Sequence, residues 1–194
     1  MIPLLLQKVK AKGYRIFVSG HWNVNIIGIR RQGRPNEFDD TLALVYKDDT
    51  GTWITREFKA TTDPGTYWLR NPMRTDGTAV LAPGQYLGTH MVDKHSGKYD
   101  AVCQRLGKVR VFRDSDKDSV IDWNKFDDSV AGMYGINIHR ASARRESVTV
   151  DRWSAGCQVI QSFDDFEVFM KIIKKSAAEW GNKFSYTLLE EEDV

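Results

Sequence analysis

Several features are scarce in this chain of 194 residues, and each scarcity excludes a class of protein. Only two cysteines are present, Cys103 and Cys157, too few for a disulfide framework, so we expect both to be free thiols. The net charge is +2, the difference between 28 basic and 26 acidic residues, and gives no indication of a nucleic-acid partner. The longest apolar runs, such as Ile26–Ile29, fall far short of the roughly 20 residues that a membrane-spanning helix requires, so we expect no membrane span.

The first residues, MIPLLLQKVKAKGYRI, also lack the pattern of a secretory signal. Their apolar stretch precedes the lysines, and no small-residue cleavage site follows. We therefore expect synthesis in a cytoplasm without a signal peptide. Hydrophobic residues make up 41% of the chain, enough for one globular core, and no linker, repeat or low-complexity segment divides it. The sequence predicts a single domain over residues 1–194.

Short alternating or apolar segments bounded by Gly, Asn and Asp predict a β-rich fold. The expected strands are Tyr14–Val18, Val24–Ile29, Thr41–Tyr46, Thr52–Phe58, Gln85–Val92, Val109–Phe112 and Tyr134–His139. A single helix is expected near the C-terminus, where Ser162 precedes an acidic first turn and apolar residues recur at helical spacing to about Trp180. A last strand follows over Phe184, Tyr186 and Leu188. The predicted class is mainly β, a β-rich α+β fold with a C-terminal helix and strand.

A histidine and a cysteine form the most informative pair in the chain. His139 ends an expected strand, and Cys157 follows eighteen residues later in the turn Ser154-Ala155-Gly156-Cys157. A thiol nucleophile needs a base within hydrogen-bond reach and backbone amides that can bind an oxyanion. Small residues at 155 and 156 let the backbone approach a substrate carbonyl, so we expect the amides of residues 155–157 to form the oxyanion hole.

This stretch resembles the catalytic domain of the L,D-transpeptidase family, whose signature is a histidine, about fifteen residues, and then Ser/Thr-His-Gly-Cys. His139, Ser154, Gly156 and Cys157 follow that pattern in order. The resemblance implies an L,D-transpeptidase-like β-sandwich, a Cys157 nucleophile, a His139 general base and peptidoglycan stem peptides as substrate. It also implies that a backbone carbonyl, here that of Arg140, orients the base.

Two positions depart from the family pattern. Ala155 replaces the second histidine, and Val159 replaces an arginine that often follows the cysteine. The Ser-Ala-Gly-Cys form resembles bacteriophage-encoded relatives, which implies a peptidase of endolysin type that cuts stem-peptide bonds. It also implies action at the cell wall after phage lysis or as a virion component. Cross-linking by transpeptidation stays as one alternative, and a non-catalytic wall-binding or virion structural module as another.

Residues around this pair are candidates for binding substrate. The loop between His139 and Cys157 is rich in arginine, which suits the carboxylates of stem peptides, although a solvated loop explains the same charges. His90 lies on an expected strand that can face the cleft. The candidates for substrate binding are Arg144, Arg145, Arg152, Trp153 and His90.

The sequence also contains two candidate metal sites. Asp114, Asp116, Asp118 and Asp122 occupy positions 1, 3, 5 and 9 of a calcium-type loop, but Ser119 replaces the usual glycine and Lys125 the final glutamate. We keep Ca²⁺ as a candidate ligand there, beside a turn that needs no ion. His90 and His95 allow a zinc-hydrolase alternative, but their spacing matches no hydrolase motif. The acyl-transfer reaction itself requires no cofactor, and the oligomeric state is left open.

Overall fold

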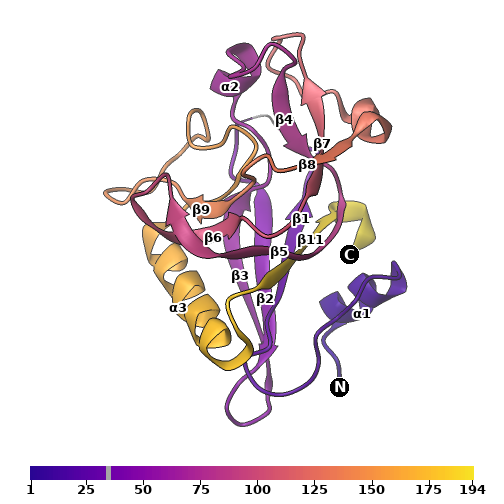
Figure 1. Ribbon diagram of the computed structural model, residues 1–194, viewed down its shortest axis with the longest axis vertical. Helices are drawn as coiled ribbons and strands as arrows, with labels where there is room; N and C mark the ends of the chain where they lie inside the picture. Colours follow the sequence, from indigo (N-terminus) through magenta and orange to yellow (C-terminus); the bar gives the residue numbers. More distant parts are fainter. Residues whose placement is uncertain (34–35) are drawn as a thin grey trace.

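The computed structural model describes residues 1–33 and 36–194, and two sheets dominate it (Figure 1). The smaller sheet has the order β4 (Thr78–Leu81), β7 (Val109–Asp114), β8 (Val130–Gly132). The larger sheet closes on itself because its first and last members, β1 and β2, also pair with each other. Its order is β1 (Asn25–Arg30), β11 (Phe184–Glu190), β5 (Gly84–His95), β6 (Tyr99–Gln104), β9 (Ile138–Arg140), β10 (Gln158–Ile160), β3 (Trp53–Thr61), β2 (Asp40–Lys47).

The β-rich α+β class with a C-terminal helix and strand is confirmed. Helix α3 (Phe163–Trp180) begins where expected, because the Ser162 hydroxyl accepts a hydrogen bond from the Asp165 amide at 3.3 Å. Figure 1 shows α3 lying along one side of the larger sheet. Its buried face, with Phe166, Phe169 and Ile173, joins the main hydrophobic core. The last strand, β11, pairs in parallel with β1 and antiparallel with β5.

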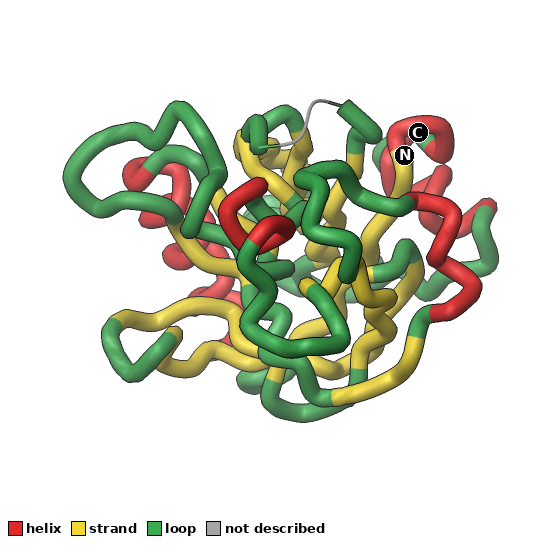
Figure 2. The backbone as a smooth tube through the Cα atoms, turned by 90° about the horizontal axis from the view of Figure 1, so that it is seen from above, coloured by secondary structure: helices red, strands yellow, loops and turns green. Residues whose placement is uncertain are grey.

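The remaining helical segments were not expected from the sequence. Helix α1 (Leu4–Ala11) uses the N-terminal apolar residues as a packing face: Leu6 and Val9 are buried in a second cluster against β1, β2 and β11. A short helix, α2 (Thr66–Arg70), and two 3₁₀ segments, η1 (Trp123–Asp128) and η2 (Glu191–Asp193), complete the fold. Figure 1 and Figure 2 show the two termini on the same side of the molecule, where Lys12 forms an ion pair with Asp193.

The expected strand at Tyr14–Val18 is wrong, because this segment is extended but belongs to no sheet. Side chains take the place of a neighbouring strand. The Asn25 amide accepts a hydrogen bond from Phe17 N and donates one to Phe17 O, both at 2.8 Å. The Gln85 amide bonds in the same reciprocal way to the backbone of Arg15. Residue pattern alone does not distinguish a strand from a segment whose backbone is satisfied by distant side chains.

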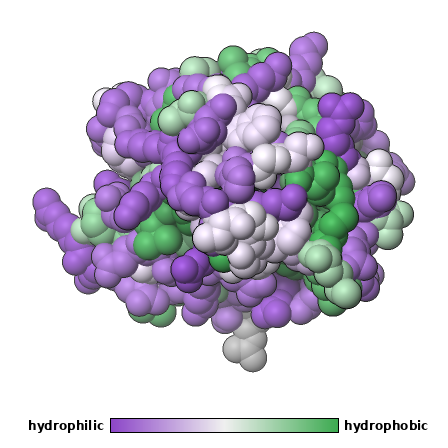
Figure 3. All heavy atoms as spheres, turned by 90° about the horizontal axis from the view of Figure 1, so that it is seen from below, coloured by the Kyte–Doolittle hydropathy of each residue, from purple (hydrophilic) through white to green (hydrophobic). Residues whose placement is uncertain are grey.

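Across the described part of the chain, we find no helix that has both the length and the apolar character needed to cross a membrane. On the face drawn in Figure 3, hydrophilic side chains predominate and the hydrophobic ones are scattered among them.

Candidate active site

Strand pairing brings the two halves of the sequence motif together. Strands β9 and β10 are parallel neighbours, with His139 in register with Val159. Cys157 immediately precedes β10 and therefore lies beside Asn137, which immediately precedes β9. The Asn137 amide donates to Cys157 Sγ at 3.4 Å, and the thiol donates to Gly135 O at the same distance. Cys157 is partly buried as a residue, whereas the other cysteine, Cys103, is buried.

The backbone before His139 is irregular because one side chain occupies its amides. Oε1 of Gln104 accepts hydrogen bonds from Tyr134 N at 3.1 Å and Ile136 N at 3.0 Å. These amides are therefore not available to a sheet, and β9 is shorter than the expected strand Tyr134–His139. Gln104 fixes the segment that carries Gly135 and Asn137 against the thiol.

The His139 ring is held as the resemblance implies. Its Nδ1 lies 2.8 Å from Arg140 O, and an imidazole that donates from Nδ1 leaves Nε2 unprotonated. The Tyr99 hydroxyl lies 3.4 Å from both Nδ1 and the same carbonyl oxygen. In the described residues, Nε2 has no hydrogen-bond partner. The arrangement suits a ring that accepts a proton at Nε2.

A second imidazole lies against the first, a contact that residue pattern alone does not indicate. The rings of His95 and His139 stack with centroids 4.0 Å apart. His95 Nδ1 lies 3.1 Å from the Asn137 side-chain amide, so Asn137 contacts both His95 and Cys157. His95 comes from the end of β5, more than forty residues before the motif, and only the β5–β6 hairpin brings it here.

In the resting protein, Cys157 and His139 are both uncharged. Burial raises the pKa of the Cys157 thiol to about 11, while burial and the neighbouring His95 lower the pKa of His139 to about 3. Among residues 1–33 and 36–194, no hydrogen bond joins the Cys157 thiol to the His139 ring, since the thiol instead donates to Gly135 O. A preformed thiolate–imidazolium pair is therefore absent from this part of the structure, and the geometry corresponds to a neutral thiol beside a neutral base.

The turn that carries Cys157 offers fewer free amides than expected. The Gly156 amide donates to Ser154 Oγ at 3.2 Å, and Ser154 Oγ donates to Cys157 O at 2.7 Å. Ser154 therefore closes the turn and is itself fully buried. The amides of Ala155 and Cys157 make no hydrogen bond within the described chain. They are the two donors left for an oxyanion.

The position of this turn requires glycine at 156. Gly156 has φ +118°, and a Cβ there would lie 2.4 Å from Ala79 O of β4. The turn also contacts the Asp63-Pro64-Gly65 turn, where the Gly65 amide donates to Ser154 O at 2.9 Å. The small sheet and the segment after β3 together fix the nucleophile loop.

A buried arginine supports this segment from the interior. Arg30 is fully buried and donates to Thr62 Oγ1, Thr62 O and Leu81 O at 2.7–2.9 Å. Its guanidinium also pairs with Asp63 at 2.8 Å. Asp40 accepts hydrogen bonds from both the amide and the hydroxyl of Thr62. This polar network holds the turn that contacts Ser154, and the sequence did not point to it.

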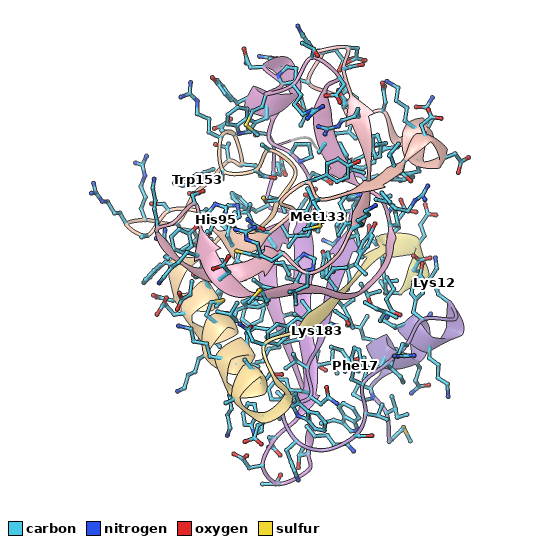
Figure 4. All side chains as sticks on the ribbon, viewed as in Figure 1. Lys12, Phe17, His95, Met133, Trp153 and Lys183 are labelled. Atoms are coloured by element: carbon cyan, nitrogen blue, oxygen red, sulfur yellow. The ribbon has the colours of Figure 1, made fainter. Side chains whose placement is uncertain are left out.

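Four of the expected substrate-binding residues lie on the surface of the loop before Cys157. Arg144 and Arg145 are exposed, and Trp153 is 42% exposed. Arg152 stacks its guanidinium on Tyr67 of α2 at 4.0 Å from the ring centroid. In the view of Figure 4, Trp153 and His95 lie on the same side of the molecule. These side chains are accessible to a ligand, and their role in binding stays a prediction.

The prediction that His90, the fifth of these residues, binds substrate is wrong. Its side chain is fully buried, with Nδ1 2.8 Å from the Thr89 hydroxyl and Nε2 2.9 Å from Ile136 O. Burial lowers its pKa to about 4. His90 points into the core and reaches neither substrate nor metal. Both ring nitrogens of His90 are already hydrogen-bonded within the core, which argues against a zinc site formed by His90 and His95.

Two depressions in the surface lie beside Cys157 and His139. A groove of about 740 Å³ between the β5–β6 hairpin and α3 includes Tyr99 and Arg140, which both contact the His139 side. A cavity of about 140 Å³ lies beside Ala155. The cavity is lined by Trp68, Met73, Arg74, Gly77, Thr78, Ala79, Arg113, Tyr134 and Ala155. Its two arginines, which the sequence analysis did not select, give it a positive lining next to the nucleophile turn.

The expected calcium-type loop is only partly assembled. Carboxylate oxygens of Asp114, Asp116 and Asp122 lie within 4.8 Å of one another. Asp118 is not in this group; its Oδ1 accepts a hydrogen bond from the Val120 amide at 2.7 Å within the turn. Lys125 forms an ion pair with Asp122. The ligand set predicted from the sequence is therefore corrected to three residues.

Comparison of the chain with protein-family models, with curated proteins and with solved structures gave no match. The assignment of a function accordingly depends on the geometry described above and on the resemblance of the 134–160 stretch to L,D-transpeptidases.

Proposed function

We propose that this protein is a cysteine-dependent acyl transferase that acts on peptidoglycan stem peptides and passes the acyl group to water. The observation that carries the proposal is the parallel pairing of β9 and β10. It sets the partly buried Cys157 beside the strand of a histidine whose Nδ1 is fixed by a carbonyl. Two free amides in the nucleophile turn supply the oxyanion donors that thiol acyl transfer also requires.

The reaction begins with a rotation of the Cys157 side chain away from Gly135 O toward His139. Nε2 of His139 then takes the thiol proton as sulfur attacks the peptide carbonyl, and the amides of Ala155 and Cys157 donate to the oxyanion. Collapse breaks the C–N bond as His139 returns the proton to the leaving amine, which leaves a thioester. Water attacks the thioester, His139 accepts its proton, and cleavage of the C–S bond restores the thiol and releases a carboxylic acid.

A neutral resting pair makes proton transfer part of the chemical step. Since the pKa of Cys157 is raised and that of His139 is lowered, the charge-separated state forms only when substrate and the oxyanion donors stabilise it. This protects the thiol from oxidation and alkylation in the free protein.

The substrate class comes from the resemblance. Ser154, Gly156 and Cys157 follow the family signature, and exposed arginines near the site provide partners for stem-peptide carboxylates. Hydrolysis is preferred to cross-linking because the Ser-Ala-Gly-Cys form resembles phage-encoded relatives. Action at the wall after lysis or from a virion belongs to the same proposal.

A non-catalytic wall-binding module is the second candidate. The observation that favours it is the thiol hydrogen bond to Gly135 O in place of one to the imidazole. In that case the fold and the arginine-rich loop would bind the wall without breaking a bond.

The test is incubation of the wild-type protein, Cys157→Ala and Cys103→Ala with purified sacculi and muropeptides, followed by mass analysis. Cys103 is the matched control because it is the only other cysteine in the sequence and is buried. We expect shorter fragments, with water added, from the wild type and Cys103→Ala but not from Cys157→Ala.

The other outcomes are equally informative. Larger cross-linked products that depend on Cys157 would replace hydrolysis by transpeptidation. If no product forms and all three proteins sediment with sacculi, the wall-binding module is correct and catalysis is rejected.

A further inference from the structure

The end of β7 carries a buried carboxylate that lacks a partner. Asp114 is fully buried, and its Oδ1 is the only buried side-chain polar atom in the described residues without a hydrogen bond. Its other oxygen, Oδ2, accepts from the Asp122 amide at 3.1 Å. A buried carboxylate oxygen that no donor of the protein satisfies is destabilising, so its presence points to a positive ligand.

Two further carboxylates lie next to that of Asp114. One oxygen each from Asp114, Asp116 and Asp122 lies within 4.8 Å of the other two. Ca²⁺ has ligand distances of about 2.3–2.6 Å and a flexible coordination geometry, so carboxylate oxygens this close together can share one ion. Mg²⁺ demands shorter distances and a near-ideal octahedron, so an irregular group of carboxylates favours Ca²⁺.

The charge of the group is not balanced by the protein. In the part of the chain that the structure describes, Asp122 pairs with Lys125, and neither Asp114 nor Asp116 takes part in a salt bridge. One ammonium faces three carboxylates, so a divalent cation completes the balance.

We propose that Asp114, Asp116 and Asp122 bind one Ca²⁺ ion that holds the 114–122 loop in place. The role is structural, because the loop leads into η1, whose Trp123 and Phe126 pack on Phe112 and on Leu69 of α2. The loop also contacts α2 through Ser119, which accepts a hydrogen bond from Arg70. The ion therefore stabilises the small sheet and the helix that follows the Gly65 turn, at a distance from the thiol chemistry.

The test compares thermal unfolding of chelator-treated protein with and without CaCl₂, in the wild type, Asp116→Asn and Asp118→Asn. The two variants are matched: both residues are exposed, and each accepts a hydrogen bond from the amide two residues later. Only Asp116 belongs to the ligand group. At roughly 100 times the dissociation constant, we expect Ca²⁺ to raise Tm by about 5–10 °C in the wild type. Asp118→Asn should respond in the same way, and Asp116→Asn should lose most of the shift.

Asp114→Asn provides a second signature. Because it removes a buried unpaired charge, the metal-free variant should melt above the metal-free wild type and show no response to CaCl₂. The proposal is overturned if CaCl₂ leaves the Tm of the wild type unchanged, if Asp116→Asn keeps the full shift, or if MgCl₂ gives the same shift at the same concentration.

Discussion

Replacement of Arg30 by methionine tests the polar network behind the nucleophile loop. Arg30 lies at the end of β1, and its side chain is fully buried. It donates to two carbonyls and one hydroxyl and pairs with Asp63, whose side chain is 17% exposed. Methionine keeps the unbranched apolar stem but removes every donor.

The cost follows from what the substitution leaves behind. Breaking a buried ion pair by removing one partner costs about 3–5 kcal/mol, because the remaining charge is uncompensated. The Leu81 carbonyl also loses a donor, which adds about 1–3 kcal/mol if no water replaces it. Burial raises the pKa of Asp63 to about 7, so protonation removes part of the orphaned charge, and a second, 3.4 Å hydrogen bond from Gln158 to Thr62 O also reduces the loss. We expect the free energy of unfolding to fall by about 3–5 kcal/mol.

Urea unfolding followed by tryptophan fluorescence gives the measurement, and the next residue is the control. Arg31 pairs with Glu191 at the surface, with both side chains more than half exposed, so Arg31→Met should cost less than about 1 kcal/mol. Asp63→Asn added to Arg30→Met should restore part of the loss, since it removes the orphaned charge. Equal losses for Arg30→Met and Arg31→Met, or no recovery in the double variant, would refute the reasoning.

Three further predictions concern the turn, the core histidine and the thiol. Gly156→Ala should destabilise the protein more than Gly13→Ala, because both glycines have positive φ but only Gly156 has backbone within 2.4 Å of the added carbon; equal Tm losses would contradict this. His90 should make folding acid-sensitive, because its pKa is 6.5 in the unfolded chain and about 4 in the folded protein. As the pH falls, the unfolded state therefore binds a proton first. The contribution of His90 to the free energy of unfolding is complete above pH 6.5 and declines by about 3 kcal/mol toward pH 4. Urea unfolding at neutral pH and at about pH 4 should show this decline in the wild type and a smaller one in His90→Gln; the same decline in both would argue against it. Iodoacetamide should label Cys157 slowly at neutral pH, since a pKa raised from 9.0 to about 11 leaves about a hundredfold less thiolate. The labelling rate should rise with pH. Fast labelling of Cys103→Ala at neutral pH would instead reveal a thiolate–imidazolium pair.

Elements that depend on neighbouring residues could be predicted from the sequence. The cap at Ser162, the apolar stripe of α3 and the stop at Gly181 are short-range signals, and the helix begins and ends where they indicate. The His139 and Cys157 motif was visible for the same reason, because its spacing lies within one stretch of chain. The Arg140 carbonyl beside His139 adds a contact between adjacent residues.

The rest was decided by contacts between distant segments. Tyr14–Val18 resembles a strand, but amide side chains from Asn25 and Gln85 satisfy its backbone. His90 and His95 lie five residues apart on β5, so alternation places them on opposite faces of the strand, but only the pairing of distant segments decides that one meets the core and the other meets His139.

The sequence by itself determined the β-rich class, the C-terminal helix and strand, and the presence of a thiol and an imidazole in one motif. Only the tertiary structure decided that the thiol rests on Gly135, that His95 completes the imidazole stack and that Arg30 supports the turn from within. The physical reason is that local propensity and capping act over a few residues, whereas burial and buried hydrogen bonds depend on which distant segments the closed sheet brings together.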